Sequence, residues 1–398
     1  MSGSGPCVLL FTDTLGDVNG VSRFIRSIGE CALDTGRNLR IITSTNFPVP
    51  RARNISNFPP LAAMRMPKYE NLELALPPAG AVMREARRLR PDAVHVSTPG
   101  PVGLLGRCLA RRLGVPLLGT YHTDFPAYIE RLFCNESLAL GCRGFMRWFY
   151  APFARLFSRS DEYIETMSGL GIPRDRCLRL RPGIALESFQ PRYRDDAALS
   201  RLCGSPPGTV RVLYAGRVSV EKGLPLLAEA WRIADPALHS RKVHAELVIV
   251  GDGPYRAAME ELLRGTRTVF LGFRHAEELS MIYAGCDLFA FPSTTDTLGQ
   301  VVMEAMSSGL PVLVTDIGGP RELVRDEQTG HVLSARDSRH WAAEITRLVT
   351  DSDRRTRMGR AAHESVQPRS IQRSFDEFWD AHTSLLGNLR DRHGVSPA

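Results

Sequence analysis

The sequence predicts an α/β protein made of two doubly wound domains, each with a parallel sheet between layers of helices. Three observations lead to this fold class. The chain has 398 residues, which exceeds one ordinary core and suits two domains. Short apolar runs alternate with amphipathic stretches along both halves, as in parallel sheets. Residues 191–209 interrupt this alternation with a charged segment and then Gly204-Ser205-Pro206-Pro207-Gly208, which is typical of a linker.

The first domain is expected over residues 1–190. Its opening apolar run lacks a basic leader, so we interpret it as a buried strand rather than a signal peptide. The predicted strands are Cys7–Thr12, Leu39–Thr43, Ala93–Ser97 and Pro116–Tyr121, and the predicted helices are Val21–Asp34, Ala79–Leu89 and Gly103–Leu113.

The second domain is expected over residues 210–370, after the linker 191–209. Residues 371–398 are predicted to form a C-terminal helix that packs back on the N-terminal domain. The predicted strands are Val210–Ala215, Ala245–Val250, Val269–Leu271, Leu288–Phe291 and Val312–Thr315, and the predicted helices are Leu224–Ala234, Tyr255–Leu263, Ala276–Ala284, Val301–Ser308 and Ser338–Thr350. Ligands of such sheets bind at the carboxyl ends of the strands, so we expect an active site between the two domains.

Charge and cysteine usage narrow the function classes. Residues 1–190 carry 24 Lys and Arg against 16 Asp and Glu, whereas the remainder carries 26 against 27. This basic first half indicates either a solvated surface or an anionic partner such as a membrane lipid. The eight cysteines are scattered without a C-x-x-C pair, which favours reduced thiols and argues against a metal site. No apolar run reaches the roughly 18 residues of a membrane span, and we expect a cytoplasmic protein.

The segment from Ser293 to Gly309 carries the most informative pair of carboxylates. Asp296 is expected in a loop after a buried strand, and Glu304 one to two turns inside the following helix. Carboxylates at this edge of a sheet can accept hydrogen bonds from a sugar or ribose diol. The amides of Leu298 and Gly299 at the helix start offer a complementary site for a diphosphate. The competing interpretation makes Asp296 a helix cap and Glu304 a surface residue.

Two cations follow the first strand of the second half. Arg217 and Lys222 lie in Gly216-Arg217-Val218-Ser219-Val220-Glu221-Lys222-Gly223, at the expected carboxyl end of that strand. Cations in this position can neutralise a leaving diphosphate, which is the largest electrostatic demand of sugar transfer.

These motifs together resemble the retaining nucleotide-sugar glycosyltransferases of family 4, also called group 1, which have the GT-B fold. The resemblance extends over nearly the whole chain: the paired acids, the G-R-x-x-x-E-K-G loop, the Gly251-Asp252-Gly253-Pro254 turn and Gly318-Gly319-Pro320 occur in family order. It implies that Arg217 and Lys222 hold the donor diphosphate, Asp296 binds sugar hydroxyls and Glu304 binds the ribose. The T-D-T-x-G pattern at Asp296 is similar to the branch of mannosyl- and sulfoquinovosyl-lipid synthases.

The first half carries matching segments. Residues 13–22 resemble the family's glycine-bearing first loop, which implies that Gly20 lies near the donor diphosphate. Residues 120–126 resemble the active-site histidine segment, which implies that His122 contacts the donor sugar, with Asp124 and Tyr128 on the acceptor side. The family's N-G-V-D turn appears as Pro182-Gly183-Ile184-Ala185, so the roles of its Asn and Asp have no counterpart. The resemblance implies no metal and no cofactor.

The acceptor is predicted less directly. Residues 128–159 interleave aromatic and Leu side chains with Arg, and we interpret them either as an amphipathic helix on an anionic membrane or as a core-facing helix. With the basic first half, this favours a lipid or glycolipid acceptor at the cytoplasmic face of a membrane. The alternatives are a soluble sugar acceptor and a sugar-nucleotide epimerase of the same fold. The charge shows no nucleic-acid motif, and we expect no nucleic-acid partner.

Overall fold

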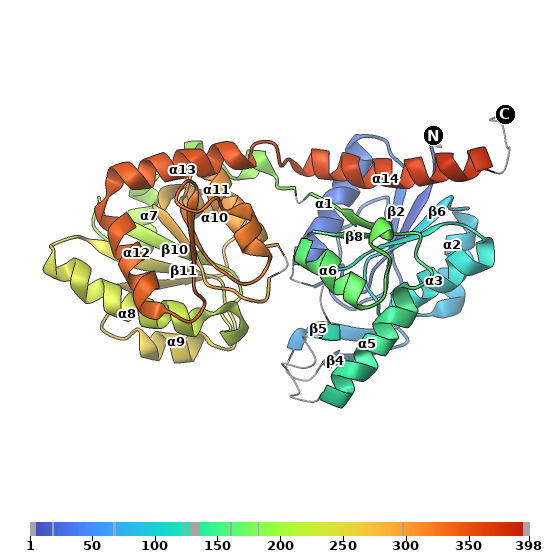
Figure 1. Cartoon of the computed structure of the whole chain (residues 1–398), viewed down its shortest axis with the longest axis horizontal. Helices are drawn as coiled ribbons and strands as arrows, with labels where there is room; N and C mark the ends of the chain where they lie inside the picture. Colours follow the sequence, from blue (N-terminus) through green and yellow to red (C-terminus); the bar gives the residue numbers. More distant parts are fainter. Residues whose placement is uncertain are drawn as a thin grey trace. The chain divides into compact units, whose positions relative to one another are not determined.

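The computed structural model of the chain describes residues 5–17, 20–66, 69–122, 125–126, 136–159, 161–181, 183–296 and 298–392 (Figure 1). It divides into two compact units. Unit 1 comprises Met1–Gly183 together with Ile371–Ala398, and unit 2 comprises Ile184–Ser370. Each unit is described by itself below.

Unit 1 is built on a seven-stranded sheet with the order β3-β2-β1-β6-β7-β8-β9, in which every pairing is parallel. Its strands are β1 (Val8–Phe11), β2 (Leu39–Thr43), β3 (Ile55–Asn57), β6 (Ala93–Val96), β7 (Leu117–Thr120), β8 (Arg155–Ser158) and β9 (Cys177–Arg179). A separate antiparallel hairpin consists of β4 (Ala62–Met66) and β5 (Tyr69–Leu76). The central strands are almost wholly apolar because parallel strands are covered on both faces.

The helices of unit 1 cover both faces of this sheet. They are α1 (Gly20–Asp34), α2 (Ala79–Arg88), α3 (Pro101–Leu113), α5 (Glu136–Tyr150), α6 (Asp161–Gly169) and α14 (Ile371–Arg392). Alternate residues of β1 enter two separate cores: Leu9 and Phe11 pack with α2, α3, α5 and α6, while Val8 and Leu10 pack with α1 and α14. This period of two is the signature of a strand with helices on either side.

Helix α14 brings the end of the chain onto unit 1. Its buried side chains Phe375, Phe378 and Trp379 complete the core that contains α1. Arg37, just after α1, forms an ion pair of 2.5 Å with Asp376 and lies over the Phe375 ring. The last helix is therefore part of the same hydrophobic core as the first strand.

Unit 2 contains a six-stranded parallel sheet with the order β12-β11-β10-β13-β14-β15. Its strands are β10 (Val210–Ala215), β11 (Ala245–Val250), β12 (Thr268–Gly272), β13 (Leu288–Phe291), β14 (Val312–Thr315) and β15 (Gly330–Leu333). Its helices are α7 (Asp196–Cys203), α8 (Leu224–Ser240), α9 (Arg256–Leu262), α10 (Ala276–Gly285), α11 (Gln300–Ser307), α12 (Ser338–Thr350) and α13 (Ser352–Val366).

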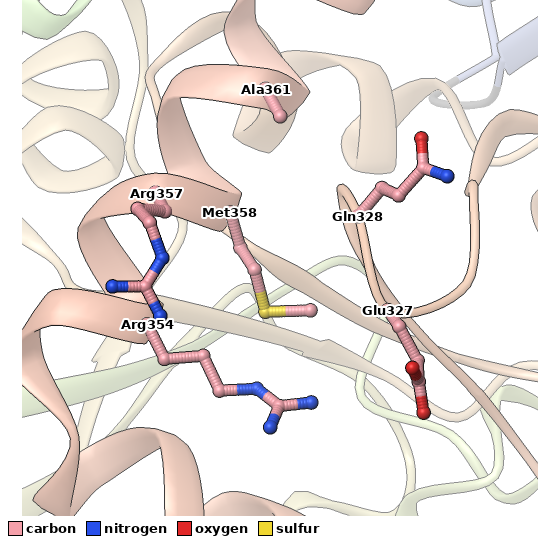
Figure 2. A pocket seen from close by; sticks show the side chains of 6 residues that line it. All are labelled: Glu327, Gln328, Arg354, Arg357, Met358 and Ala361. Atoms are coloured by element: carbon pink, nitrogen blue, oxygen red, sulfur yellow. The ribbon is translucent and has the colours of Figure 1, made fainter.

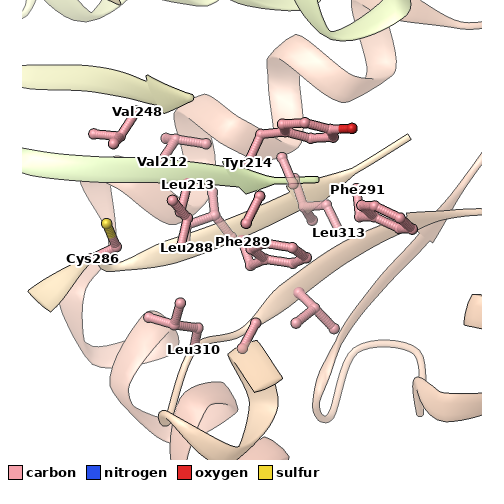
Figure 3. Close-up of a cluster of buried hydrophobic side chains, with 14 of the residues drawn as sticks. Val212, Leu213, Tyr214, Val248, Cys286, Leu288, Phe289, Phe291, Leu310 and Leu313 are labelled. Carbon is pink, nitrogen blue, oxygen red and sulfur yellow. The ribbon is translucent and has the colours of Figure 1, made fainter. Parts of the chain in front are cut away.

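One continuous core fills unit 2. Figure 3 shows its centre, where Val212 and Leu213 of β10 lie beside Leu288 and Phe289 of β13. The same residues are the register partners of these two strands. The tight apolar packing fixes the ends of β10 and β13 relative to each other, and the loops that follow them carry the predicted donor residues.

The predicted fold class of two doubly wound α/β units is confirmed. Two segments differ from the expectation. Residues 191–209, predicted as a linker, contain α7, whose N-cap Asp195 accepts a hydrogen bond from the Ala198 amide, and they belong to unit 2. The Gly and Pro cluster that suggested a linker follows this helix and links it to β10. The second difference concerns residues 155–158, which form the buried strand β8 and not part of an amphipathic helix.

Candidate functional site

The sheet of unit 2 changes its direction of winding between β10 and β13. Strands β11 and β12 continue from β10 toward one edge, and β14 and β15 continue from β13 toward the other. The loops after β10 and β13 therefore leave the sheet in opposite directions, and ligands of doubly wound folds bind at such a point. The predicted donor residues of the two loops follow these two strands: Arg217, Lys222, Asp296, Leu298 and Gly299.

The structure brings Lys222 and Asp296 into direct contact. Lys222 Nζ lies 2.8 Å from each oxygen of the Asp296 carboxylate, and both side chains are 23% exposed. The pair is thus partly open to solvent, unlike a buried structural ion pair. Sequence reasoning assigned the two residues to one site but did not predict that they pair with each other.

The loops on either side of this pair are held in place by specific hydrogen bonds. Ser293 Oγ donates to the Asp296 carboxylate, and Thr295 Oγ1 donates to the carbonyl of Glu221 at 3.2 Å. The Asp296 carbonyl accepts from the Gly319 amide at 2.9 Å. The Asp296 side chain is consequently positioned by its own loop and by the Gly-Gly-Pro segment after β14.

Gly223 shows why the first loop requires glycine. Its φ is +72°, and an added Cβ would lie 2.1 Å from the carbonyl oxygen of Pro292. The loop after β10 can reach the loop after β13 only because no side chain separates them. This close approach places Lys222, the preceding residue, within reach of Asp296.

Glu304 lies in α11 and is 1% exposed. Its Oε2 accepts a hydrogen bond of 3.0 Å from the Tyr283 hydroxyl of α10. The alternative in which Glu304 is a surface residue is therefore wrong. Gly299, at φ +72°, is the N-cap of α11, and Leu298 before it is buried. The backbone amides at the start of α11 follow directly on the loop of Asp296.

Arg217 lies two residues beyond β10 and is half-buried. The Tyr214 hydroxyl donates a hydrogen bond of 2.8 Å to its backbone carbonyl, which fixes the start of the loop. The phenol of Tyr214 is buried, and this desolvation, together with the negative charges of Asp296 and Glu221, raises its pKa well above the usual value. Tyr214 therefore remains a neutral hydrogen-bond donor beside the loop.

In unit 1, adjacent strands place polar side chains at one edge of the sheet. Ser97 follows β6 and His122 follows β7, and Ser97 Oγ lies 2.9 Å from His122 Nε2. His122 is 8% exposed and packs edge-on against the Phe24 ring of α1. Burial, and secondarily the positive charge of Arg159, lowers the pKa of His122 well below its usual value. The imidazole is therefore neutral near pH 7 and suited to hydrogen bonding rather than to charge stabilisation.

The predicted first loop is tied to the same edge. Asp13, just after β1, accepts hydrogen bonds of 2.7 Å from the Thr98 hydroxyl and from the Val102 amide in the first turn of α3. The carbonyl of Leu15 accepts from Ser22 Oγ and from the Arg26 guanidinium. These bonds hold the loop from both ends, and α1 begins at Gly20. Asp124 and Tyr128, the predicted acceptor-side residues, lie outside the described residues.

A hollow on unit 2 has a different location. It encloses about 430 Å³ and is lined by Glu327, Gln328, Arg354, Arg357, Met358 and Ala361 (Figure 2). The lining comes from α13 and from the turn that precedes β15, so it lies toward the amino ends of the strands. It is thus separate from Lys222 and Asp296. Within the described ranges, no group of three or more His, Cys, Asp or Glu side chains is arranged to hold a metal ion.

Sequence reasoning missed Ser293, Ser97 and the place of Arg159 near His122. Each stands one or two residues beyond an apolar strand, as Arg217 and His122 do. Ser293 and Ser97 are common residues without a motif of their own. Arg159 was assigned to the amphipathic stretch because β8 was not recognised as a strand.

Comparison with known proteins supports one family. Residues 18–188 match the family model "Glycosyltransferase Family 4" and residues 209–351 match "Glycosyl transferases group 1". A GDP-mannose-dependent alpha-mannosyltransferase of Mycobacterium tuberculosis is 31% identical over 94% of this chain and 95% of its own length. The sulfoquinovosyl transferase SQD2 of Arabidopsis thaliana is also 31% identical, over 81% of this chain, which spans 61% of that protein.

Solved structures agree with this fold. Anabaena Alr3699/HepE in complex with UDP superposes with a TM-score of 0.75 at 18% identity, covering 96% of this chain and 100% of that one. WaaG, a glycosyltransferase of lipopolysaccharide biosynthesis, superposes with a TM-score of 0.72 at 18% identity, covering 95% and 99%. Taken with the family matches, these findings show that the chain belongs to glycosyltransferase family 4, a retaining family of hexosyltransferases with the GT-B fold that use nucleotide sugars.

Proposed function

We propose that this enzyme transfers a hexosyl unit from GDP-mannose or a UDP-hexose to a hydroxyl group of a membrane lipid or glycolipid. The observation that carries the donor half of this proposal is the Lys222–Asp296 pair at the point where the sheet of unit 2 changes direction. In a sugar diphosphate, the anionic diphosphate can bind the cation and the sugar hydroxyls can donate to the carboxylate.

The pair offers a simple account of donor binding. A diphosphate carries more negative charge than one carboxylate, so it competes for Lys222 Nζ when the donor enters. The Asp296 carboxylate is then free to accept hydrogen bonds from sugar hydroxyls, while Ser293 keeps it in position. We assign Arg217 and the amides of Leu298 and Gly299 to the diphosphate as well, and Glu304 to the ribose.

In the proposed reaction the acceptor hydroxyl attacks the anomeric carbon on the face from which the diphosphate departs. The bond from the anomeric carbon to the leaving phosphate oxygen breaks, and that oxygen takes the proton of the hydroxyl. Arg217 and Lys222 neutralise the charge that grows on the leaving diphosphate. From unit 1, neutral His122 contacts the sugar hydroxymethyl, and Gly20 lies near the diphosphate.

The lipid half of the proposal rests on the exposed surface of α5. Its Met146, Phe149 and Tyr150 are buried, so this helix packs in the core, yet Leu140 and Trp148 on the same helix are 69% and 54% exposed. Leu138 and Phe145 are exposed as well, and Arg143 and Arg147 lie among them. Exposed apolar side chains interleaved with Arg suit an anionic bilayer surface. Among the described residues, no helix is both long and apolar enough to cross a bilayer.

The donor is named from the relatives. The mycobacterial relative is a GDP-mannose-dependent enzyme and the plant relative transfers a sulfoquinovosyl unit.

A thermal-shift panel of GDP, UDP and ADP sugars tests the donor half. A ligand that binds only the folded protein raises its melting temperature. We expect a rise with one nucleotide series in the wild type and a rise that is largely lost in Lys222→Met. Lys242→Met is the matched control because Lys242 is an exposed lysine of unit 2 outside the site. Equal shifts in both variants would remove Lys222 from the donor site.

The acceptor half is tested by transfer to lipids. Activity should rise with anionic liposomes and fall with added salt, because screening weakens attraction to a charged surface. Replacing Trp148 and Leu140 by Ser should abolish the liposome effect. Activity indifferent to liposomes and salt would favour the soluble sugar acceptor, and conversion of the donor without acceptor would favour the epimerase.

A further inference from the structure

Arg159 is a buried cation that forms no hydrogen bond or ion pair with the residues that the structure describes. It directly follows β8, is 8% exposed, and its Nε and Nη2 form no hydrogen bond with any described residue. Its guanidinium lies over the Phe24 ring of α1, whose centroid is 4.1 Å from Cζ. Burial lowers the pKa of Arg159 to about 10, so the guanidinium stays charged near pH 7.

An unpaired buried charge is costly, and proteins seldom keep one without a use. No ion pair involving Arg159 occurs in the part of the chain that the structure describes. By contrast, the buried Arg211 of unit 2 is paired with Glu246 at 2.7 Å and with two serine hydroxyls. The fold therefore satisfies the buried Arg211 with structural partners, whereas Arg159 has no counter-charge among the residues that the structure describes.

The two unpaired N–H donors of Arg159 are arranged to bind an anion with two oxygens. Nε and Nη2 form one edge of the planar guanidinium, and this edge donates two parallel hydrogen bonds to two oxygens of one anion. The Phe24 ring lies beside the guanidinium but offers no hydrogen-bond acceptor in the plane of this edge, so Nε and Nη2 keep their donors for such a contact. The unsatisfied pair thus matches a phosphate, sulfonate or carboxylate group.

The location connects Arg159 with the substrate-facing edge of unit 1. Ser97, His122 and Arg159 follow β6, β7 and β8, which are consecutive strands of the parallel sheet. His122 and Arg159 both contact the Phe24 ring. Phe24 lies in the second turn of α1, whose amino end favours negative charge.

We propose that Arg159 is an oxyanion-binding residue of unit 1 that holds a phosphate or sulfonate group carried by one of the substrates, beside His122. The group is either the headgroup of an anionic lipid acceptor or an anionic group of the donor. The identity of the substrate that carries the anion rests on the proposed function. The binding of an anion by Arg159 does not depend on it.

Calorimetric titration with inorganic phosphate at constant ionic strength tests the proposal. The titrations use the Arg217→Met/Lys222→Met background, which removes both cations of the donor loops and so weakens phosphate binding there. We expect Arg159→Met to weaken phosphate binding about tenfold or more, because a desolvated charge pair is lost. Arg155→Met, at the other end of β8, is the matched control and should bind phosphate like the background protein.

Thermal stability separates binding from a structural role. Arg159→Met removes an unpaired charge, so its melting temperature in the absence of phosphate should equal or exceed that of the background protein. Arg159→Lys keeps the charge without the paired donors and should bind phosphate more weakly than arginine does. Phosphate affinity unchanged in Arg159→Met, or no phosphate binding in the background protein, would overturn the proposal.

Two further arms identify the carrier. Loss of binding to phosphatidylglycerol vesicles in Arg159→Met, with phosphatidylcholine vesicles as reference, assigns the anion to the acceptor. Weaker binding of nucleotide sugar in Arg159→Met, with donor loops intact, assigns it to the donor. A wild type that binds no nucleotide sugar would refute the proposed function, yet the phosphate titrations would still decide the role of Arg159.

Discussion

Acid should destabilise unit 1 through histidines that are buried in the neutral form. His382 of α14 is fully buried, its Nδ1 lies 2.7 Å from the carbonyl of Phe378, and its Nε2 lies 3.2 Å from Nδ1 of His95. His95 Nε2 in turn lies 3.0 Å from the Thr120 hydroxyl. The Phe378 carbonyl can only accept, so His382 donates through Nδ1 and accepts through Nε2. His95 then donates through Nδ1, and both rings are neutral.

The size of the effect follows from the pKa of His382, which burial lowers to about 4. An unfolded histidine has a pKa near 6.5. Because the folded pKa is the lower one, the unfolded chain binds more protons, and the free energy of unfolding falls as the pH drops below about 6.5. Between pH 7.5 and pH 5 this single group should remove about 2 kcal/mol of stability. His95 and His122, whose pKa values are also lowered by burial, act in the same direction.

The assay is urea unfolding at pH 7.5, 6 and 5, followed by tryptophan fluorescence, for which Trp379 of α14 reports on unit 1. His382→Phe should lower the stability at pH 7.5, yet show a loss between pH 7.5 and 5 that is about 2 kcal/mol smaller than in the wild type. His239→Gln, an exposed histidine of unit 2, should keep the wild-type loss. An unchanged pH dependence in His382→Phe would show that His382 is not held neutral by the fold.

Three other perturbations address unit 2. Arg217→Ala should lower kcat more than it raises KM, because its charge acts on the departing diphosphate; an unchanged kcat in steady-state kinetics would reject that role. Gly223→Ala should lower the free energy of unfolding by about 3 kcal/mol or more in urea unfolding, since the φ of Gly223 is +72° and the new Cβ would lie 2.1 Å from Pro292 O. Gly204→Ala, with a φ of +67° and open space around it, should cost only about 1 kcal/mol, and equal costs would contradict the steric argument. Tyr283→Phe should lower the stability of unit 2 by about 2 kcal/mol, because the buried Glu304 carboxyl group loses a hydrogen bond; a neutral effect in the same assay would show that Glu304 has sufficient other partners.

The sequence predicted the parts of the fold in which a local pattern is strong. Central strands such as Leu288–Phe291 are uninterrupted apolar runs, and they are present as expected. Edge strands such as Cys177–Arg179 are short and partly exposed, so no such run marks them. The sequence pattern did not predict helix α7, because its charged start and the Gly and Pro residues after it are also typical of a linker.

In the candidate site, too, local motifs predicted some features and not others. Motifs identified Lys222 and Asp296, but their contact depends on Gly223 approaching Pro292 across 69 residues of sequence, which no local pattern encodes. Arg159 lacked a motif, and its missing partners became evident only when its surroundings were known. Properties that depend on what surrounds a side chain, such as the neutrality of His122, likewise required the folded structure.

The return of α14 to unit 1 has a consequence for biosynthesis. Unit 2 is one uninterrupted segment, Ile184–Ser370, whereas unit 1 needs residues from both ends of the chain. During translation the core around Val8, Leu10 and Phe24 stays incomplete until Phe375 and Phe378 have left the ribosome. Unit 2 can therefore complete its folding before the unit that is synthesised first, and the nascent chain must carry a partly covered apolar core through most of its synthesis.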